Sequence, residues 1–462
     1  MADADAARVK PGQSPGMLHP ERILVVHERY RQRGGEDNVF EAEADLLERH
    51  GHRVERLVVD NTGIPDQPSA RQAIRLAVGT VWSPEGARLV RRATQRFRPE
   101  VVHVHNTFPL LSPAVHAAAH AAGAATVQTL HNYRLTCPAA ILFRDGRYCE
   151  DCVGRVVPWP GVLHGCYYGS RSRTVAVAAL IAVHRARGTW RRDVDRIIVL
   201  SNFQRGILLR AGLDPARVAV KPNSIDDPGE GGSHAGAFLF AGRLAPEKGV
   251  AVLLDAWATG IPVPCRVAGN GPLEDVVRRA SAASAIEPLG HLANPAVLAE
   301  MRDARALILP SVWPEGGLPL VATEAFASGL PVIASRIGNM AEAITDRRTG
   351  LLFEPGDARG LAAAARTAIE TPDVLRAMGR AAREEYLARF APDRGYEHLL
   401  RIYSEAIAVR RAADERSVSQ GSPRQCGRAR RETEGRADPR GLRRCDDVRG
   451  RGQPTPRRPC PW

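Results

Sequence analysis

Short apolar runs alternate with longer amphipathic stretches along most of this chain. The runs are bounded by Gly, Pro, Asn or Ser, which is typical of buried parallel strands. The stretches between them have helical periodicity, as in 41–50, where Ala42, Leu46 and Leu47 are apolar. The alternation predicts an α/β protein with two doubly wound parallel sheets. The predicted strands are 22–27, 101–105, 126–130, 196–200, 237–241, 265–268, 306–310 and 331–335.

A polar, glycine-rich stretch separates the first four runs from the last four. We therefore predict an N-terminal Rossmann-like domain at 20–221, a linker at 222–236 and a second Rossmann-like domain at 237–385. Helices at 386–408 are expected to pack back on the first domain. From 409 to 462 the apolar periodicity ends and Arg, Gly and Pro dominate, which predicts a disordered basic tail.

The positive charge of the chain is concentrated near its C-terminus. Fifteen arginines against seven acidic residues give 410–462 a charge of +8, out of +13 for the whole chain. The basic balance is therefore mainly a property of the tail, and it is only a weak indication of nucleic-acid binding. That binding remains the rival function from another class.

The chain shows no signal peptide and no apolar run of the roughly 18 residues that a membrane span needs. We therefore expect a cytoplasmic protein. The longest apolar run, 175–183, is flanked by arginines, which would suit contact with an anionic inner membrane surface. A core helix with solvated cations at its ends explains the same pattern equally well. The arginines concerned are Arg171, Arg173, Arg185, Arg187, Arg191 and Arg192.

Two segments in the second half carry candidate chemistry. In 240–249 a predicted strand ends at Gly242, and Arg243 and Lys248 follow five residues apart, a spacing that suits one diphosphate. A solvated loop is the alternative. In 310–335 the pattern is strand, glycine-rich turn, helix and strand, and Pro319 fits the first turn of that helix.

Free N–H groups at the start of that predicted helix would bind an anion. Glu324 lies further along the helix, among apolar neighbours that leave it little exposed face. A carboxylate beside an anion site is expected to bind a neutral group, such as the hydroxyls of a ribose. A surface glutamate is the alternative.

Together these segments resemble the retaining glycosyltransferases of family 4, which have the GT-B fold. The resemblance extends from about residue 20 to about residue 408. It rests on motifs that are specific only in combination. They are the Gly34-Gly35 loop with Gly51-His52, the segment 221–226, Gly242-Arg243-Leu244 with 246–249, the segment 310–335, and 349–357.

The resemblance implies roles for individual residues. Arg243 and Lys248 would hold the donor diphosphate, and Glu324 the ribose. Glu315 would lie beside the donor sugar, and His131 would contact that sugar near the reacting carbon. The implied catalytic residues are thus His131, Arg243, Lys248 and Glu315. The implied donor site also includes Gly34 and Gly35, which would close over the phosphate, and Gly317, Leu318, Pro319, Leu320 and Glu324.

One departure from the family concerns the two glutamates. Eight residues separate Glu315 from Glu324, where the family has seven, and the extra residue falls in the turn 316–318. If the turn absorbs it as a bulge, Glu315 faces the donor sugar; otherwise Glu315 points to solvent. We expect the first arrangement, because Trp313 and Pro314 fix the approach of the chain.

Four cysteines fall within an insertion at 137–166: Cys137, Cys149, Cys152 and Cys166. Four thiolates with this spacing would form a closed structural zinc site. Four unconnected thiols are an equally good interpretation, and an iron–sulfur cluster is a distant third.

The sequence therefore predicts a GT-B enzyme with two Rossmann-like domains facing a cleft. It would transfer a sugar from a nucleotide-diphosphate sugar to a saccharide or lipid-linked saccharide, with retention at the anomeric carbon. No catalytic metal is expected, because the fixed cations Arg243 and Lys248 would stabilise the leaving diphosphate. A nucleotide-sugar epimerase or a phosphorylase is the rival within the fold, and the segment 315–335 favours neither.

Overall fold

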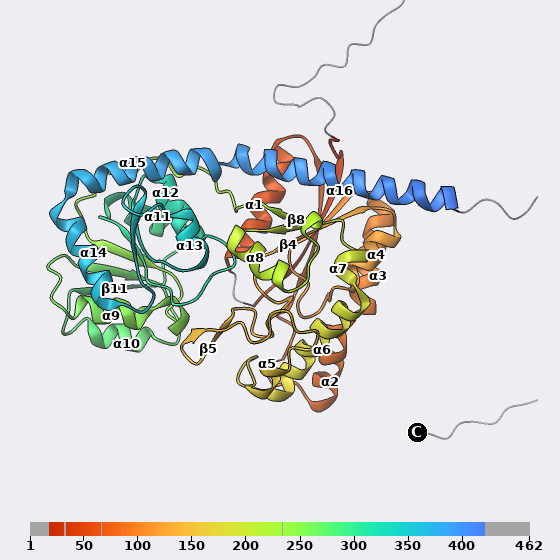
Figure 1. The fold of residues 1–462 in the computed structure, drawn as a ribbon, viewed down its shortest axis with the longest axis horizontal. Helices are drawn as coiled ribbons and strands as arrows, with labels where there is room; N and C mark the ends of the chain where they lie inside the picture. The colour runs from red at the N-terminus through yellow and green to blue at the C-terminus, as the bar shows by residue number, and fades with distance from the viewer. Residues whose placement is uncertain (1–17, 32–33, 66, 233, 421–462) are drawn as a thin grey trace, which may run out of the picture. The chain divides into compact units, whose positions relative to one another are not determined.

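The computed structural model describes residues 18–31, 34–65, 67–232 and 234–420. Two six-stranded parallel sheets, each with helices on both faces, belong to one compact unit that ends at Asp414 (Figure 1). The predicted α/β class with two doubly wound sheets is confirmed. Every strand pair in the two sheets is parallel.

The first sheet has the strand order β2-β1-β3-β4-β7-β8. Its strands are β1 (Arg22–Arg29), β2 (Arg53–Asp60), β3 (Val101–Val104), β4 (Ala125–Leu130), β7 (Arg196–Val199) and β8 (Val218–Val220). Its helices are α1 (Gly35–Arg49), α2 (Ala70–Val81), α3 (Pro84–Phe97), α4 (Ala114–Ala121), α5 (Trp159–Leu163), α6 (Arg171–Arg187), α7 (Thr189–Arg192) and α8 (Asn202–Arg210). A short antiparallel hairpin, β5 (Phe143–Arg144) and β6 (Arg147–Tyr148), stands apart from the sheet.

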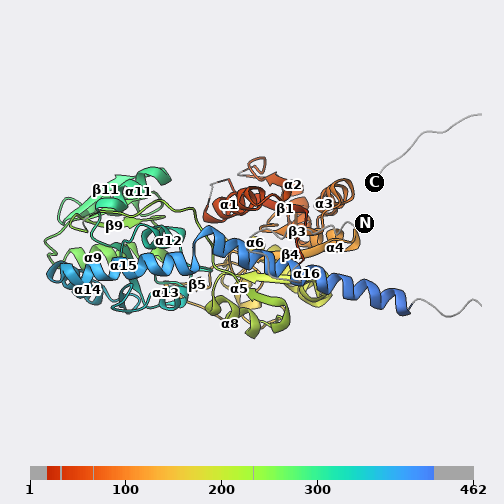
Figure 2. The same cartoon turned by 90° about the horizontal axis from the view of Figure 1, so that it is seen from above.

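The second sheet has the order β11-β10-β9-β12-β13-β14. Its strands are β9 (Phe238–Ala241), β10 (Cys265–Ala268), β11 (Ile286–Gly290), β12 (Leu307–Leu309), β13 (Val332–Ser335) and β14 (Gly350–Phe353). Its helices are α9 (Val250–Trp257), α10 (Glu274–Ala280), α11 (Asn294–Asp303), α12 (Leu320–Ala327), α13 (Gly338–Ala343), α14 (Ala358–Glu370) and α15 (Pro372–Arg389). Helices α9 and α14 pack on one face, and α11 and α12 on the other (Figure 2).

Successive residues of each central strand point to opposite faces, so each sheet has two apolar layers. In β1, Ile23 and Val25 pack under α1, while Leu24 and Val26 pack under α3 and α4. All four side chains are buried. The strands are apolar on both faces because both faces are covered by helices.

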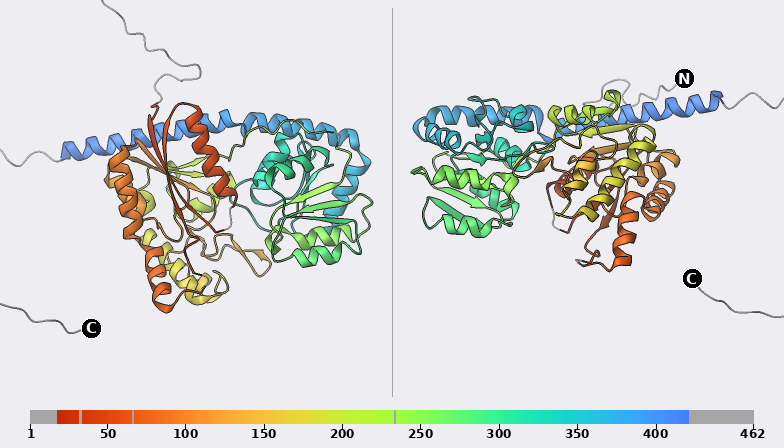
Figure 3. Two further views of the ribbon diagram at one scale, coloured as in Figure 1. Left: turned by 180° about the vertical axis from the view of Figure 1, so that it is seen from behind. Right: turned by 60° about the horizontal axis from the view of Figure 1, so that its bottom comes forward.

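The last helix, α16 (Pro392–Gln420), packs on the first sheet. Its residues Leu399, Ile402 and Tyr403 are buried in the same core cluster as Phe40 of α1, and α16 passes beside α1 (Figure 3). The helix continues to Gln420, beyond residue 409, where the sequence pattern placed the start of the tail. The rest of the predicted tail, 421–462, lies outside the described residues.

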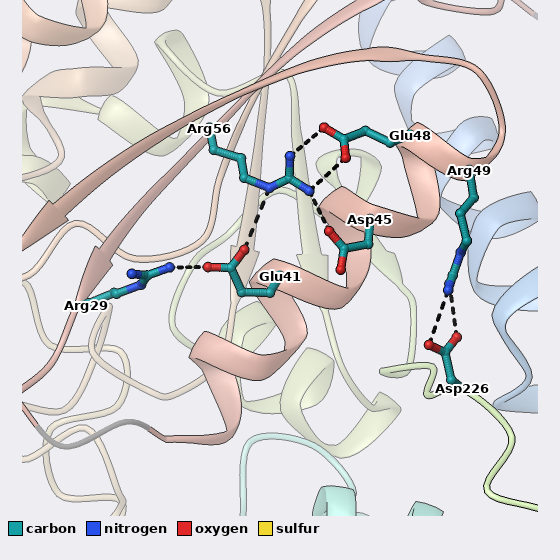
Figure 4. A network of polar contacts seen from close by, with 7 residues as sticks. All are labelled: Arg29, Glu41, Asp45, Glu48, Arg49, Arg56 and Asp226. Atoms are coloured by element: carbon teal, nitrogen blue, oxygen red, sulfur yellow. Dashed lines mark hydrogen bonds and ion pairs between the residues drawn. The ribbon is translucent and has the colours of Figure 1, made fainter.

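Helix α1 has an outer face, which is charged, and an inner face, which packs against the sheet. On the outer face, Glu41, Asp45 and Glu48 pair with Arg56 of β2, whose guanidinium lies 2.6 Å from Asp45 Oδ1 (Figure 4). Arg49 pairs with Asp226 at 2.9 Å, which ties the helix to the segment after β8. The opposite face is directed into the sheet, and it carries charged residues as well as apolar ones.

Candidate active site

Lys248 and Glu315 form an ion pair beside the carboxyl ends of β9 and β12. Lys248 Nζ lies 2.6 Å from Glu315 Oε1, and Ser311 Oγ donates to the same oxygen at 3.2 Å. Gly249 follows with φ of 71°, and a Cβ there would lie 1.8 Å from the Pro310 carbonyl oxygen. Only glycine allows this close approach between the two segments.

Glu315 is buried, so the arrangement in which it points to solvent does not occur. Gly316 and Gly317, which lie in the turn with the extra residue, pack closely on the first domain. A Cβ on Gly316 would lie 2.4 Å from the His131 carbonyl oxygen, and one on Gly317 would lie 2.6 Å from Leu200 Cβ. The Tyr133 hydroxyl donates to the Glu315 carbonyl oxygen at 2.9 Å. The turn therefore brings Glu315 next to the segment that carries His131.

Arg243 extends into solvent beside this ion pair. Its side chain is 65% exposed, and its guanidinium lies 3.8 Å from Glu247 Oε1. A guanidinium with so few contacts remains available to an anionic ligand.

Helix α12 begins at Leu320, with Pro319 as its N-cap residue, one position before the predicted first turn. Glu324 is half-buried in this helix, and its Oε1 accepts a hydrogen bond from Asn294 Nδ2 at 2.7 Å. Burial raises the pKa of Glu324, an effect that the Asn294 hydrogen bond opposes. Its carboxyl group is thus already used as a hydrogen-bond acceptor.

The glycine loop of the first domain lies close to the start of α12. Gly34 is the N-cap residue of α1, and its N–H donates to Asp37 Oδ2 at 2.8 Å. A Cβ on Gly35 would lie 3.6 Å from Leu320 Cδ1. The structure therefore places the two predicted phosphate-binding segments, one from each domain, next to each other.

His131 directly follows β4, and its Nε2 lies 3.1 Å from His105 Nδ1. Burial lowers the pKa of His131 to about 4, so the imidazole is neutral near pH 7.

Behind His131 lies a buried polar cluster that the sequence interpretation missed. It consists of Glu43 from α1, His103 and His105 from the β3 region, and Lys221 after β8. Two histidines in an otherwise apolar strand were the available signal, because a polar residue is rarely buried without a partner.

Glu43, His103 and His105 are the only described group whose ligand atoms could surround a metal ion. Both ring nitrogens of His103 are already used, by the Tyr403 hydroxyl at 2.8 Å and Thr129 Oγ1 at 2.7 Å. The Lys221 ammonium pairs with Glu43. These contacts leave the described cluster without three free ligand atoms for a metal ion.

A pocket opens beside His131 at the carboxyl ends of β1, β3 and β4. The Arg134 guanidinium lies 4.1 Å from the centre of the Phe108 ring, and its Nη1 donates to the Pro138 carbonyl oxygen at 2.7 Å. Aromatic and polar side chains are mixed in the lining. The lining includes Tyr30, Asn106, Thr107, Phe108, His131 and Arg134.

The four cysteines of the insertion are free thiols in one loop region. Burial raises the pKa of Cys152 to about 12, and neighbouring Cys137 and Cys166 contribute. Among the described residues, no three of these sulfurs lie within 4.8 Å of one another. A zinc ion needs thiolates that gather around it at about 2.3 Å, so the structure does not support the zinc prediction.

Helix α6 is mainly a core helix. Val177, Ile181 and His184 are buried, while Val175 and Val183 remain partly exposed. In the described part of the chain, no helix combines the length and apolar character that crossing a bilayer requires.

Two doubly wound sheets whose strand ends meet at such a site define the GT-B class of fold. The family described as "Glycosyl transferases group 1" matches residues 235–371, and the "Glycosyl transferase 4-like domain" matches residues 34–224. Glycogen synthase of Mycobacterium tuberculosis is 30% identical over 340 residues, which cover 68% of this chain and 71% of the relative. The chain belongs to the group 1 glycosyl transferases.

Other similar proteins agree with this assignment. A D-inositol 3-phosphate glycosyltransferase of Kineococcus radiotolerans is 30% identical over 273 residues, covering 48% of this chain and 60% of the relative. Among solved structures, Anabaena HepE in complex with UDP has a TM-score of 0.56 at 19% identity, covering 86% of this chain and 99% of that one. Sucrose-phosphate synthase from Thermosynechococcus elongatus has a TM-score of 0.59 at 17% identity, covering 87% and 100%. The two structures show the same fold.

Proposed function

We propose that this protein transfers a sugar from a nucleoside diphosphate sugar to a saccharide or lipid-linked saccharide, with retention at the anomeric carbon. The bond between the anomeric carbon and the diphosphate oxygen breaks, and the acceptor hydroxyl oxygen bonds to the same carbon. The hydroxyl proton leaves with the diphosphate. The observation that carries the proposal is the contact of the Glu315–Gly316 turn with His131, next to Lys248.

The donor would lie with its diphosphate against Arg243, Lys248 and the N–H groups at the start of α12. These groups are fixed before reaction, so they stabilise negative charge as it grows on the leaving diphosphate. Lys248 would exchange part of its contact with Glu315 for phosphate oxygen. Glu315 would then be free to accept hydrogen bonds from the sugar, and Glu324 from the ribose hydroxyls. The UDP complexes of the HepE neighbour suggest uridine nucleotides as the first to test.

The pocket beside His131 is the proposed acceptor side. It lies on the first domain, opposite the residues assigned to the donor, and it combines aromatic surfaces with Arg134. A sugar bound in this pocket would present a hydroxyl toward the reacting carbon near His131.

A donor screen tests this proposal without knowledge of the acceptor. A ligand that binds only the folded state at 100 times its dissociation constant adds about 2.7 kcal/mol to stability. We expect at least one nucleoside diphosphate to raise the melting temperature, and Glu324→Gln to reduce that shift. No shift with any nucleoside diphosphate would contradict the proposed donor site.

Contact with a membrane surface would bring a lipid-linked acceptor to the first domain, where the proposed acceptor pocket lies. The first domain exposes Trp159, Leu163 and Val175 close to the basic start of α6, where Arg171 Nε donates to the Leu163 carbonyl oxygen at 2.9 Å. Anionic lipid attracts each basic residue near its surface by about 1 kcal/mol. We expect binding to vesicles with anionic lipid that weakens in Trp159→Ser/Leu163→Ser. Equal sedimentation of both proteins would exclude this surface.

A further inference from the structure

Three buried side chains, those of Lys221, Glu43 and His105, form a chain that connects His131 to helix α1. Lys221 Nζ donates to Glu43 Oε1, and Glu43 Oε2 lies 3.5 Å from His105 Nε2. On its other side, His105 Nδ1 lies 3.1 Å from His131 Nε2. The side chains of Lys221, Glu43 and His105 are 1%, 5% and 0% exposed. Water is therefore excluded from the chain at every member except His131.

The chemistry of these groups fixes where the protons lie. An ammonium group only donates, and an ionised carboxylate only accepts. Lys221 holds Glu43 in its ionised form, so Glu43 Oε2 needs a donor. The facing atom is His105 Nε2 at 3.5 Å, and neither atom has a hydrogen-bond partner among the described residues. His105 therefore carries its proton on Nε2.

The position of the proton on His105 determines the position of the proton on His131. A neutral imidazole has one donor and one acceptor nitrogen, so His105 Nδ1 must accept. Its neighbour, His131 Nε2, then carries the proton and donates. Among the described residues no hydrogen bond or ion pair involves His131 Nδ1, which is left with its lone pair. His131 would accept a hydrogen bond from a ligand through Nδ1 and would not donate one.

We propose that Glu43 and His105 are positioning residues that fix the tautomer of His131, so that its Nδ1 accepts a hydrogen bond from a hydroxyl of the bound sugar. The sugar contact rests on the proposed function, whereas the tautomer rests on the network alone. The parallel histidine, His103, cannot take the place of His105, because Tyr403 and Thr129 occupy its two nitrogens. The loss of one hydrogen bond of this kind costs about tenfold in rate or affinity.

The test measures the tautomer directly. Protein with ring-¹⁵N histidine is studied by NMR near pH 7.5, and the His131 signals are assigned by their loss in His131→Asn. We expect a protonated Nε2 and an unprotonated Nδ1 in both His105 and His131. A protonated Nδ1 on His131 in the wild-type protein would overturn the proposal without any variant of the network.

Glu43→Gln should reverse both tautomers. Lys221 still requires an acceptor, so the amide oxygen turns to Lys221 and the amide NH₂ turns to His105 Nε2. His105 then carries its proton on Nδ1, and so does His131. The matched control is Glu41→Gln on the outer face of the same helix. Glu41 pairs with Arg29 and Arg56, so this variant should change neither tautomer. A folded Glu43→Gln protein with unchanged tautomers would also overturn the proposal.

Added UDP-glucose separates this inference from the proposed function. We expect it to shift the His131 Nδ1 signal, and turnover in Glu43→Gln to fall roughly tenfold while Glu41→Gln stays within about twofold. If the tautomers are as predicted but saturation with donor does not shift the His131 Nδ1 signal, the network is supported and the sugar contact is refuted. Wrong tautomers with normal transfer would refute the network and leave the proposed function standing.

Discussion

Lys248 and Glu315 neutralise each other at 2.6 Å while no donor is bound. A partly buried ion pair of this kind gives little net stability, because desolvation offsets most of the attraction. The ion pair instead holds both side chains in the positions from which they would contact a charged ligand. The sequence does not show this contact, because the two residues lie 67 positions apart and meet only when β9 and β12 are neighbours.

Lys248→Ala tests the role of the ammonium in the transition state. Charge on the diphosphate increases as the bond to the sugar breaks, so the contact is strongest in the transition state. Its loss costs about 3 kcal/mol, or on the order of a hundredfold in turnover. Steady-state kinetics should show this fall with a smaller change in donor affinity, whereas exposed Arg278→Ala should behave as wild type. Unchanged turnover at saturating donor would remove Lys248 from the mechanism.

The two glutamates should respond differently to substitution by glutamine. Glu324 would hold the ribose before and during reaction, so Glu324→Gln should raise the Michaelis constant for the donor more than it lowers turnover. Glu315 would act at the sugar, and Glu315→Gln should lower turnover strongly. The comparison needs both kinetic constants for both variants. Unchanged donor kinetics in Glu324→Gln would refute the placement of the nucleotide.

Residues with a linear motif around them could be predicted, and residues that act through the fold could not. Arg243, Lys248 and Glu324 stand in glycine- and proline-rich patterns that mark turns and helix starts. Glu43 carries no such pattern, and the motif that begins at Lys221 does not show which residue Lys221 pairs with. Their pairing depends on β8 returning to the edge of the sheet near α1, which no local signal shows.

Among the strands, too, some could be predicted from the sequence and others could not. All eight predicted strands occur, and they are the four central strands of each sheet. The edge strands β2, β8, β11 and β14 were missed. Edge strands are less completely covered, so their sequences are less apolar: β2 has no fully buried residue. The pattern of buried runs therefore shows the centre of a sheet better than its limits.

Glu28 connects β1 to the loop after β3, and it should make stability depend on pH. Its carboxylate accepts the N–H groups of Leu110 and Leu111 at 2.9 Å, but burial dominates and raises its pKa from 4.5 to about 7. The folded state thus binds this proton more tightly than the unfolded state. The stabilisation is complete below pH 4.5 and is lost as the pH rises to about 7.

Urea unfolding at pH 5 and pH 8 measures this effect in wild type and Glu28→Gln. The shift corresponds to on the order of 3 kcal/mol, so the variant should become relatively more stable by that order at the higher pH. Both proteins contain the same other titrating groups, so only the difference between them is interpreted. A difference in unfolding free energy that does not vary with pH would show that Glu28 is ionised throughout.

Helix α16 should contribute to the stability of the first sheet. Ile402 is buried in the core cluster of that sheet, and Ile→Ala substitutions in cores cost about 2–5 kcal/mol. Ile402→Ala should lower the unfolding free energy by this amount in denaturant titrations, whereas exposed Val374→Ala on α15 should cost little. Equal stability of the two variants would show that α16 does not pack as described.

At the scale of the whole molecule, α16 connects the end of the second sheet to the core of the first. The glycine turn at 316–317 and the Glu342 carboxylate make further links: Glu342 accepts the N–H groups of Asn202 and Phe203 at 3.1 and 3.0 Å, at the start of α8. The proposed site requires residues from both sheets. Its function should therefore be lost whenever either set of contacts is broken, even if each sheet remains folded.

The central claim is that donor and acceptor react at the junction of the Glu315–Gly316 turn with His131. The most direct measurement is NMR analysis of the product formed from the donor that the thermal screen identifies, with a panel of saccharide acceptors. The account predicts one nucleoside diphosphate released per new glycosidic bond, with the anomeric configuration of the donor kept. An inverted product, an epimerised donor or a sugar phosphate formed with inorganic phosphate would contradict it.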